Sequence, residues 1–476
     1  MHNQQIAKLN KGNIVANHIE KFDAIVIGTG QAGPALAVRL AKSGRKTAIL
    51  ERKLFGGTCV NVGCVPTKTL IASARVAHLA RRAADFGVML DGGFHVDMKA
   101  VKARKDGVVK QSNTGVTDWL KATPNLTVIE GHGRFESATT VGVNDRLLEA
   151  NEIFINVGAR AAVPEISGLR EIEYFTNSNM MDVDFLPEHL VIVGGSYIGL
   201  EFAQAYRRFG SRVTVIEMGP RFIAREDEAV SKAVEKILEA ESIGIRLNAN
   251  CLAVSRKNNG VAVNVTCDGE TEEIVGSHLL LAVGRKPNTD DLGLDKAGVT
   301  VDARGFITVD DQLRTNIPGI WAMGDANGRG AFTHTAYNDF EIVAANLLDN
   351  DPRKVSDRIL TYALFIDPPL ARVGMTEREV RASGRKALIG RMNMARVGRA
   401  HERSETQGMM SVLVDAETKK ILGAALLGIE ADEAIHAIID LMYADKPYTV
   451  IQRAVHIHPT VSELIPTLLG DLKEFV

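Results

Sequence analysis

The chain has 476 residues, of which 45% are hydrophobic and 24% charged, and its formal net charge is −2. This length predicts about three domains, and this composition and charge argue against a nucleic-acid-binding or membrane-bound protein. Residues 1–21 are polar and lack an apolar signal core, so we expect a flexible extension and a cytoplasmic protein that spans no membrane.

The first predicted elements form a strand–turn–helix unit. We expect a buried strand at residues 22–27, a helix at 34–43 and a second strand at 47–50. A G-x-G-x-x-G turn joins the first strand to the helix, and an acid follows the second strand, 18 residues after the last glycine of the turn. Such a turn brings backbone amides against a pyrophosphate, and the acid accepts hydrogen bonds from a ribose. We therefore predict a dinucleotide site that uses Gly28, Gly30, Gly33 and Glu51.

Two cysteines five positions apart, Cys59 and Cys64, come next, directly before a helix-like segment. Their sulfurs can close a small disulfide loop beside a bound cofactor. Because a proline suits the first turn of a helix, Cys64 lies where the helix N-terminus lowers a thiol pKa. The alternatives are a zinc half-site and inert core cysteines. Zinc needs a second close pair, which Cys251 and Cys267 do not form. We favour the redox pair, and expect no bound metal and a structural role for the other two cysteines.

The strand–turn–helix pattern then recurs, offset by 166 residues. We expect strands at residues 190–193 and 212–216 and a helix at 200–209, with Gly194, Gly199 and Glu217 as a second dinucleotide site. Ser196 departs from the pattern because it stands where the backbone comes closest to the phosphates.

The second acid bears on the choice of nucleotide. A carboxylate at Glu217 suits a free ribose 2′-hydroxyl and repels a 2′-phosphate, which favours NADH. Arg221 and Arg225 lie just beyond it and could receive a 2′-phosphate, so NADPH stays open.

With two further motifs, at residues 315–325 and 456–463, the chain resembles the FAD-dependent pyridine nucleotide-disulfide oxidoreductases from about residue 21 to its C-terminus. The resemblance implies an α/β fold with two Rossmann-like dinucleotide-binding domains, for FAD and NAD(P)H, and a C-terminal α+β dimerisation domain. It implies the following division: an N-terminal extension at 1–21, the FAD domain at 22–156 and 285–352, the NAD(P)H domain at 157–284 and the dimerisation domain at 353–476.

The resemblance also implies roles for catalytic residues. Cys64 would be the thiol beside the flavin, and Cys59 the thiol that meets the substrate. Lys68 and Glu201 would form an ion pair near the flavin and the nicotinamide, although solvated charges would be the default without the family.

The C-terminal motif supplies the remaining catalytic residues. His458 would be the acid–base catalyst, oriented by Glu463, and would reach across a twofold axis to the cysteine pair of the other subunit. A homodimer with a shared active site is therefore expected. His456, in the same run, has the weaker claim because packing or a surface position explains it as well.

Further positions are expected to contact the cofactors. These are Asp325, which ends the second FAD motif, and Gly57, Thr58, Lys68, Gly158, Gly284 and Arg285. His334 and Tyr337 could line the flavin region or pack there. The basic cluster, Arg396, Arg399, His401 and Arg403, is first a solvated loop face, and otherwise an interface or a contact for an anionic substrate.

The expected activity passes hydride from NAD(P)H through FAD to a Cys59–Cys64 disulfide, and on to a disulfide, a thiol-bound metal or another small acceptor. The chain resembles mercuric reductases in its motifs but has no cysteine after Cys267, where those enzymes carry a further pair. A dihydrolipoamide dehydrogenase is the alternative enzyme. A nucleotide-binding redox sensor without turnover is the alternative of another class.

Overall fold

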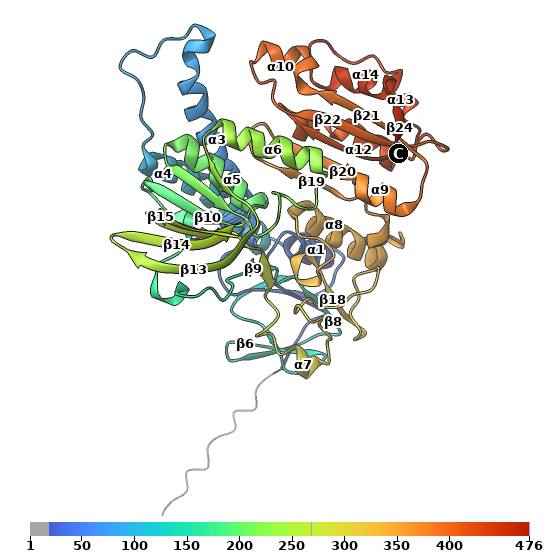
Figure 1. Cartoon of the computed structure of the whole chain (residues 1–476). Helices are drawn as coiled ribbons and strands as arrows, with labels where there is room; N and C mark the ends of the chain where they lie inside the picture. The colour runs from blue at the N-terminus through green and yellow to red at the C-terminus, as the bar shows by residue number, and fades with distance from the viewer. Residues whose placement is uncertain (1–18, 268, 476) are drawn as a thin grey trace, which may run out of the picture.

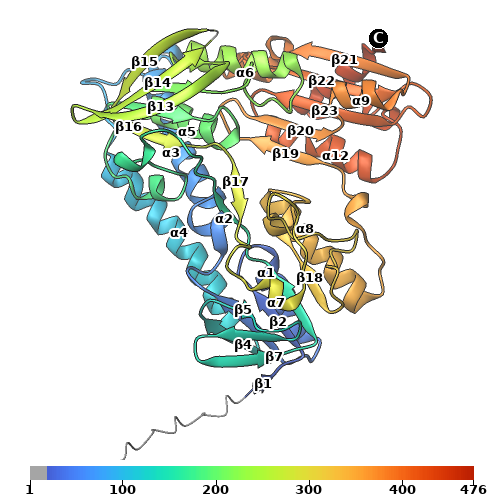
Figure 2. The ribbon, with the colours of Figure 1, turned by 60° about the horizontal axis from the view of Figure 1, so that its bottom comes forward.

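The computed structural model describes residues 19–267 and 269–475. Most of the expected N-terminal extension lies outside this range. Its last three residues are described, and they form strand β1 (Ile19–Lys21), which pairs in parallel with β7 (Arg146–Glu149) at the lower end of the molecule in Figure 2. Those three residues therefore belong to a sheet and not to an extension.

A parallel five-stranded sheet forms the lower part of the molecule in Figure 1. Its strands, in spatial order, are β18 (Ile320–Ala322), β8 (Glu152–Ile155), β2 (Ala24–Ile27), β3 (Thr47–Glu51) and β4 (Leu126–Glu130). Successive residues of a strand point to opposite faces, and here both faces are buried: Ile25 and Ile27 enter one apolar cluster, while Ala24 and Val26 enter another.

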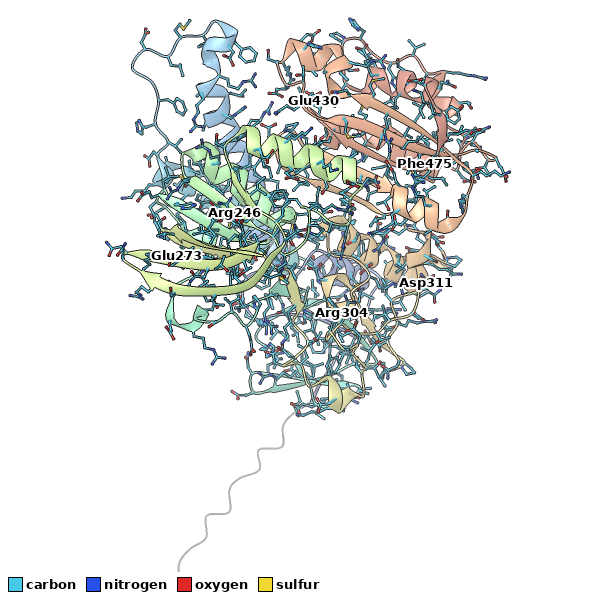
Figure 3. The ribbon with its side chains drawn as sticks, viewed as in Figure 1. Arg246, Glu273, Arg304, Asp311, Glu430 and Phe475 are labelled. Carbon is cyan, nitrogen blue, oxygen red and sulfur yellow. The ribbon has the colours of Figure 1, made fainter. Side chains whose placement is uncertain are left out.

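A second parallel sheet repeats this arrangement. It consists of β12 (Gly244–Arg246), β11 (Arg212–Ile216), β10 (His189–Val193) and β16 (His278–Leu281). An antiparallel sheet of β13 (Ala249–Lys257), β14 (Gly260–Cys267) and β15 (Glu270–Gly276) packs beside it. Figure 3 labels Arg246 at the end of β12 and Glu273 on β15. The expected strand over residues 212–216 is confirmed, and the other expected elements differ from the observed ones by one to three residues at their ends.

The C-terminal part holds an antiparallel six-stranded sheet, drawn in orange and red in Figure 1. Its strands, in order, are β19 (Thr361–Leu364), β20 (Leu370–Gly374), β23 (Ile421–Leu427), β22 (Met409–Asp415), β21 (Ala387–Asn393) and β24 (Lys473–Phe475). The remaining strands are β5 (Arg134–Phe135), β6 (Thr140–Val143), β9 (Ala159–Ala161) and β17 (Arg285–Pro287).

Helices flank all three main sheets. The longer ones are α1 (Ala32–Lys42), α3 (Cys64–Arg81), α4 (Met98–Lys121), α5 (Tyr197–Phe209), α6 (Glu228–Ala240) and α8 (Thr333–Ala344). The shorter ones are α2 (Gly57–Asn61), α7 (Leu294–Ala297), α9 (Glu377–Ser383), α10 (Gly398–Glu402), α11 (Ala431–Ala434), α12 (His436–Tyr443), α13 (Thr449–Gln452) and α14 (Ile465–Gly470). Among the described residues, no helix combines the length and apolarity needed to cross a membrane.

Helix α3 connects the parts of the molecule. It packs against α4 on one side and against α5 of the second parallel sheet on the other. Because α3 begins at Cys64, its N-terminus faces the space between the two parallel sheets, where the carboxyl ends of their strands and the two glycine turns meet.

Candidate active site

One cavity of about 2100 Å³ joins both glycine turns and the cysteine pair. Nearly all the expected site residues line it: Gly28, Gly30, Glu51, Gly57, Thr58, Cys59, Cys64, Lys68, Gly158, Gly194, Glu201, Glu217, Gly284, Arg285 and Asp325. Four expected residues do not. Gly33 and Gly199 lie behind the turns, and His458 and Glu463 lie elsewhere in the C-terminal part.

The first glycine turn is closed by backbone packing. Gly28 has a φ of +104°, and a side-chain carbon there would lie 2.4 Å from the carbonyl oxygen of Asn156. At Gly33 such a carbon would lie 2.2 Å from the carbonyl oxygen of Gly28, so helix α1 can approach the turn only without a side chain at this position. Gly194 and Gly199 repeat both contacts in the second turn.

Each turn is tied to the acid that ends the neighbouring strand. The backbone amide and hydroxyl of Thr29 donate to Glu51 at 3.1 and 2.6 Å. In the second unit the amides of Gly195 and Gly219 donate to the two carboxylate oxygens of Glu217, at 2.6 and 2.8 Å. The carboxylates thus sit beside the turns, where a ribose next to a bound pyrophosphate would meet them.

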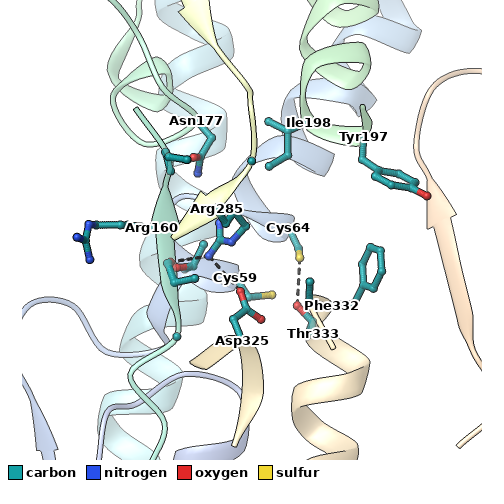
Figure 4. Close-up of a pocket in the computed structure, with 18 of the residues that line it drawn as sticks. Cys59, Cys64, Arg160, Asn177, Tyr197, Ile198, Arg285, Asp325, Phe332 and Thr333 are labelled. Atoms are coloured by element: carbon teal, nitrogen blue, oxygen red, sulfur yellow. Dashed lines mark hydrogen bonds and ion pairs between the residues drawn. The ribbon is translucent and has the colours of Figure 1, made fainter. Parts of the chain in front are cut away.

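A buried donor beside the first glycine turn also fits a bound dinucleotide. The Nδ2 atom of Asn156 is buried and has no hydrogen-bond partner among the described residues, and it lies against Gly30 and Gly33. A donor so placed fits a bound polar ligand, because buried polar groups rarely stay unpaired. Asp325 lies nearby, paired with Arg285 at 3.2 Å, and burial raises the pKa of its carboxyl group (Figure 4).

The cysteine pair is present as two free thiols. Cys59 lies on α2 and Cys64 is the first residue of α3. The pKa of Cys64 is lowered to about 6, mainly because Cys59 donates a hydrogen bond to its sulfur. Thr333 and Lys68 also lower this pKa, whereas burial raises it. The same hydrogen bond, together with burial, raises the pKa of Cys59. Cys64 is therefore the thiolate of the reduced pair, and Cys59 carries the proton.

Thr333 contributes to this difference directly. Its hydroxyl oxygen lies 3.1 Å from the Sγ atom of Cys64, at the start of α8 (Figure 4). The sequence-based interpretation named its neighbour His334 and missed Thr333, although Thr333 follows the second FAD motif by only eight residues. Asn156 was also missed. Its position at the carboxyl end of β8 was the available signal, since ligands bind at such strand ends.

Lys68 and Glu201 form the expected ion pair. The Lys68 ammonium donates to both carboxylate oxygens of Glu201, at 2.9 and 2.8 Å. Only 6% of the Glu201 side chain is exposed, and the backbone amide of Phe365 donates to it at 3.0 Å. The Lys68 ammonium also lies 4.6 Å from the centre of the Phe365 ring. The ion pair thus joins α3 to α5 in the wall of the cavity, and it is not a solvated pair on the surface.

His458 and Glu463 form the other expected pair, with Nδ1 of His458 2.8 Å from the carboxylate. The side chain of His458 is 80% exposed, and Glu463 is largely buried. Within one chain the pair does not meet the cavity that holds Cys59 and Cys64. His456 instead supports the same loop through a hydrogen bond to the carbonyl oxygen of Ser462, at 2.8 Å.

The structure places His334 and Tyr337 differently, although the sequence left the same two alternatives open for both. His334 lines the cavity, donates to the carbonyl oxygen of Thr361 at 2.8 Å, stacks on Phe332, and has a pKa lowered by burial. Tyr337 is 46% exposed and packs on Phe340 outside the cavity lining.

The basic cluster does not line the cavity, and neither does Cys267. None of Arg396, Arg399, His401 and Arg403 lines it. Cys267 lies partly buried against an apolar cluster, and the side chain of Cys251 is outside the described part of the structure.

Comparisons with known proteins agree with this geometry. A family model described as pyridine nucleotide-disulphide oxidoreductase matches residues 22–339, and that family's dimerisation domain matches residues 360–469. The chain is 35% identical over 463 residues to a probable pyridine nucleotide-disulfide oxidoreductase, RclA, of Escherichia coli (strain K12), an alignment that covers 96% of this chain and 100% of the relative. A solved Cu(II) complex of that HOCl-induced flavoprotein disulfide reductase superposes with a TM-score of 0.86 at 34% identity, covering 95% of this chain and 99% of the other.

Two other enzymes are similar along most of the chain. A dihydrolipoyl dehydrogenase of Thermus scotoductus is 33% identical over 447 residues, covering 94% of this chain and 96% of the relative. A mercuric reductase of Streptomyces lividans is 33% identical over 449 residues, covering 93% of this chain and 94% of the relative.

Proposed function

The chain belongs to the pyridine nucleotide-disulphide oxidoreductase family and is an FAD- and NAD(P)H-dependent disulfide oxidoreductase, and on this premise we propose that Cys59 delivers its electrons to a small disulfide or a thiol-bound metal. One observation carries the proposal. Cys59 and Cys64 line the cavity that joins both glycine turns, and the pKa of Cys64 is lowered to about 6 whereas the pKa of Cys59 is raised. One sulfur is therefore held as a thiolate, and the other stays protonated for exchange.

The proposed FAD site uses the first glycine turn, Glu51, Asn156 and Asp325. The second turn and Glu217 hold the nicotinamide nucleotide. When bound, the flavin supplies two-electron transfer between the nicotinamide and the cysteine pair. The Lys68–Glu201 pair lies in the wall of the cavity that joins both glycine turns, and we assign it to orienting the reacting rings.

The exchange step follows from the thiol chemistry. His458 takes the proton of Cys59, and the resulting thiolate attacks the acceptor disulfide, whose S–S bond breaks as a mixed disulfide forms. His458 then gives its proton to the first leaving thiolate. Cys64 attacks Cys59, the second acceptor sulfur leaves with the negative charge that Cys64 carried, and a Cys59–Cys64 disulfide remains. The dithiol has lost two electrons and the acceptor has gained them.

We propose NADH as the preferred nucleotide. Glu217 accepts two backbone hydrogen bonds beside the second turn, and its negative charge there disfavours a 2′-phosphate. Arg221 and Arg225 also line the cavity, and a strong preference for NADPH in kcat/KM would assign them to a 2′-phosphate and remove this part of the proposal.

The three main sheets support a division of the chain into three domains. We propose FAD binding by residues 22–156 and 285–352, nucleotide binding by 157–284, and dimerisation by 353–476 in a cytoplasmic homodimer. The exposed His458, which does not line the cavity of Cys59 and Cys64 in its own chain, supports an active site completed by the partner subunit.

The acceptor is tested with the purified holoenzyme. NADH oxidation is measured with lipoamide, glutathione disulfide, Hg(II)–thiol and Cu(II)–thiol complexes, the last because the RclA structure is described as a Cu(II) complex. We expect turnover with at least one of them. The Cys59→Ser enzyme is expected to lose it while NADH still bleaches its flavin, and Cys267→Ser is the matched control with full turnover.

Two results would contradict the proposal. Fast NADH formation from dihydrolipoamide would favour a dihydrolipoamide dehydrogenase. An enzyme whose flavin is not reduced by NADH or NADPH under anaerobic conditions would favour a nucleotide-binding sensor without turnover.

A further inference from the structure

The loop that carries His458 has little support from regular structure. No helix or strand includes residues 453–461. Val455 and Ile457 are 99% and 79% exposed, on either side of the exposed His458. Val461, at the end of the loop, is buried in the apolar core of the C-terminal sheet. The position of His458 therefore depends on the polar contacts of this loop.

Most of these contacts are internal to the loop. The hydroxyl of Thr460 donates to the carbonyl oxygen of Ile457 at 2.7 Å, and His456 bonds to Ser462. One contact arrives from another element. Nη2 of Arg399, on α10, donates to the carbonyl oxygen of Pro459 at 2.7 Å. Among the hydrogen bonds of the described residues, the Arg399–Pro459 bond is the one that joins residues 455–460 to a residue outside the segment 453–464.

Arg399 is itself held in place for this contact. Its Nη1 atom pairs with Glu402 at 2.9 Å, one turn further along α10, and 31% of its side chain is exposed. Arg403, four residues away, pairs instead with Glu430 at 3.0 Å, and each of these side chains is 45% exposed. Glu430 is labelled at the top of the C-terminal part in Figure 3. Within the basic cluster, Arg399 therefore contacts the loop of His458, and the other members do not.

We propose that Arg399 is a positioning residue for acid–base chemistry at His458. Its bond to the Pro459 carbonyl fixes the loop, so that the His458 imidazole stays aimed at the cysteine pair of the partner subunit. The bond is charge-assisted, which makes it stronger than a neutral one, and it lies one residue from the base. Proton transfer requires hydrogen-bond reach, so a loop displaced by about 1 Å loses up to about a hundredfold in rate. This inference rests on the proposed role of His458.

The first test uses the Arg399→Gln holoenzyme. We expect disulfide turnover to fall about ten- to a hundredfold. The FAD content, the thermal midpoint and anaerobic flavin reduction by NADH are expected to stay unchanged, because none of them uses the loop. Arg399→Lys keeps a donor and recovers part of the rate. Arg403→Gln is the matched control, with full turnover.

A double-mutant cycle then separates positioning from general stability. In a His458→Ala background, Arg399→Gln is expected to cost no further rate, because Arg399 acts only through His458. Full turnover of Arg399→Gln, an equal loss in the His458→Ala background, or slowed flavin reduction would overturn the inference. Full turnover of His458→Ala alone would instead remove the acid–base role itself, and the inference with it.

Discussion

At the scale of single residues, the cysteine pair shows how neighbours choose which sulfur is ionised. Two identical thiols, five positions apart, reach opposite protonation states because Cys59 donates a hydrogen bond that Cys64 accepts. Thr333 and Lys68 add to the stabilisation of Cys64, and burial opposes it. A dithiol so biased holds its negative charge at the first residue of α3, where the helix N-terminus also favours an anion.

The lowered pKa of Cys64 predicts that the reactivity of this thiol in the reduced enzyme depends on pH. Since the pKa of Cys64 is lowered to about 6, it is a thiolate above that pH and a thiol below it. We expect its alkylation rate to fall as the pH drops through about 6, as measured by mass spectrometry of the Cys64 peptide. Thr333→Ala removes one stabilising hydrogen bond, so the midpoint is expected to move upward. Thr333→Ser keeps the hydroxyl and the low midpoint. An unchanged midpoint in Thr333→Ala would exclude this role of Thr333.

At the scale of elements, α3 joins the redox pair to the rest of the molecule. It starts at Cys64, presents Lys68 to Glu201 on α5 one turn later, and carries Arg75 further on. The guanidinium of Arg75 pairs with Asp367 at 2.5 Å and with Glu405 at 3.0 Å, both in the C-terminal part. A single helix is thereby fixed to both other parts of the molecule, and this fixes the thiols relative to the two glycine turns.

The Lys68–Glu201 bridge is expected to affect the first half of the reaction. Glu201→Gln leaves Lys68 without its buried counter-charge and the cavity wall less ordered. We expect anaerobic flavin reduction by NADH to slow at least about tenfold in stopped-flow measurements, with FAD retained. Glu228→Gln is the control, because it breaks an exposed ion pair with Lys232 on α6. Its rate of flavin reduction is expected to be unchanged. Equal rates in the two variants would refute the role of the bridge.

At the scale of the whole molecule, the proposed catalytic set is divided between distant surfaces. Cys59, Cys64, Lys68 and Glu201 share one cavity, whereas the exposed His458 and its largely buried partner Glu463 lie outside it. If His458 is the base, as proposed, a second copy of the chain must bring it to the thiols. The match of residues 360–469 to a dimerisation domain agrees with that requirement.

The shared site can be tested by mixing two inactive variants. Cys59→Ser and His458→Ala homodimers each lack one half of every site. After subunits are exchanged at random, about half of the dimers are hybrids, and each hybrid has one intact site. Disulfide turnover is therefore expected to recover to about a quarter of the wild-type value. Mixtures that stay inactive, although hybrids are detected by mass, would place the complete site within one chain.

Much of this architecture was predictable from the sequence because its signals are local. The two glycine turns, each followed by an acid after 18 residues, and the cysteine pair before a proline are short patterns with direct backbone consequences. Element ends were less predictable: α5 begins at Tyr197 and not at residue 200, because the glycine turn passes directly into the helix and Gly199 already lies within it. The last residues of the expected extension became β1, since pairing with β7 outweighs their polar composition.

Local sequence patterns are thus enough to predict the α/β class, the two dinucleotide turns and the thiols that define the chemistry, because each depends on residues close together in the chain. The packing of the chain identifies further groups, such as Thr333 beside Cys64, that no local pattern indicates. Thr333 lies 269 residues from Cys64, and Arg399 lies 60 residues from Pro459. Contacts over such separations are set by how sheets and helices pack, and they leave no periodic pattern in the sequence.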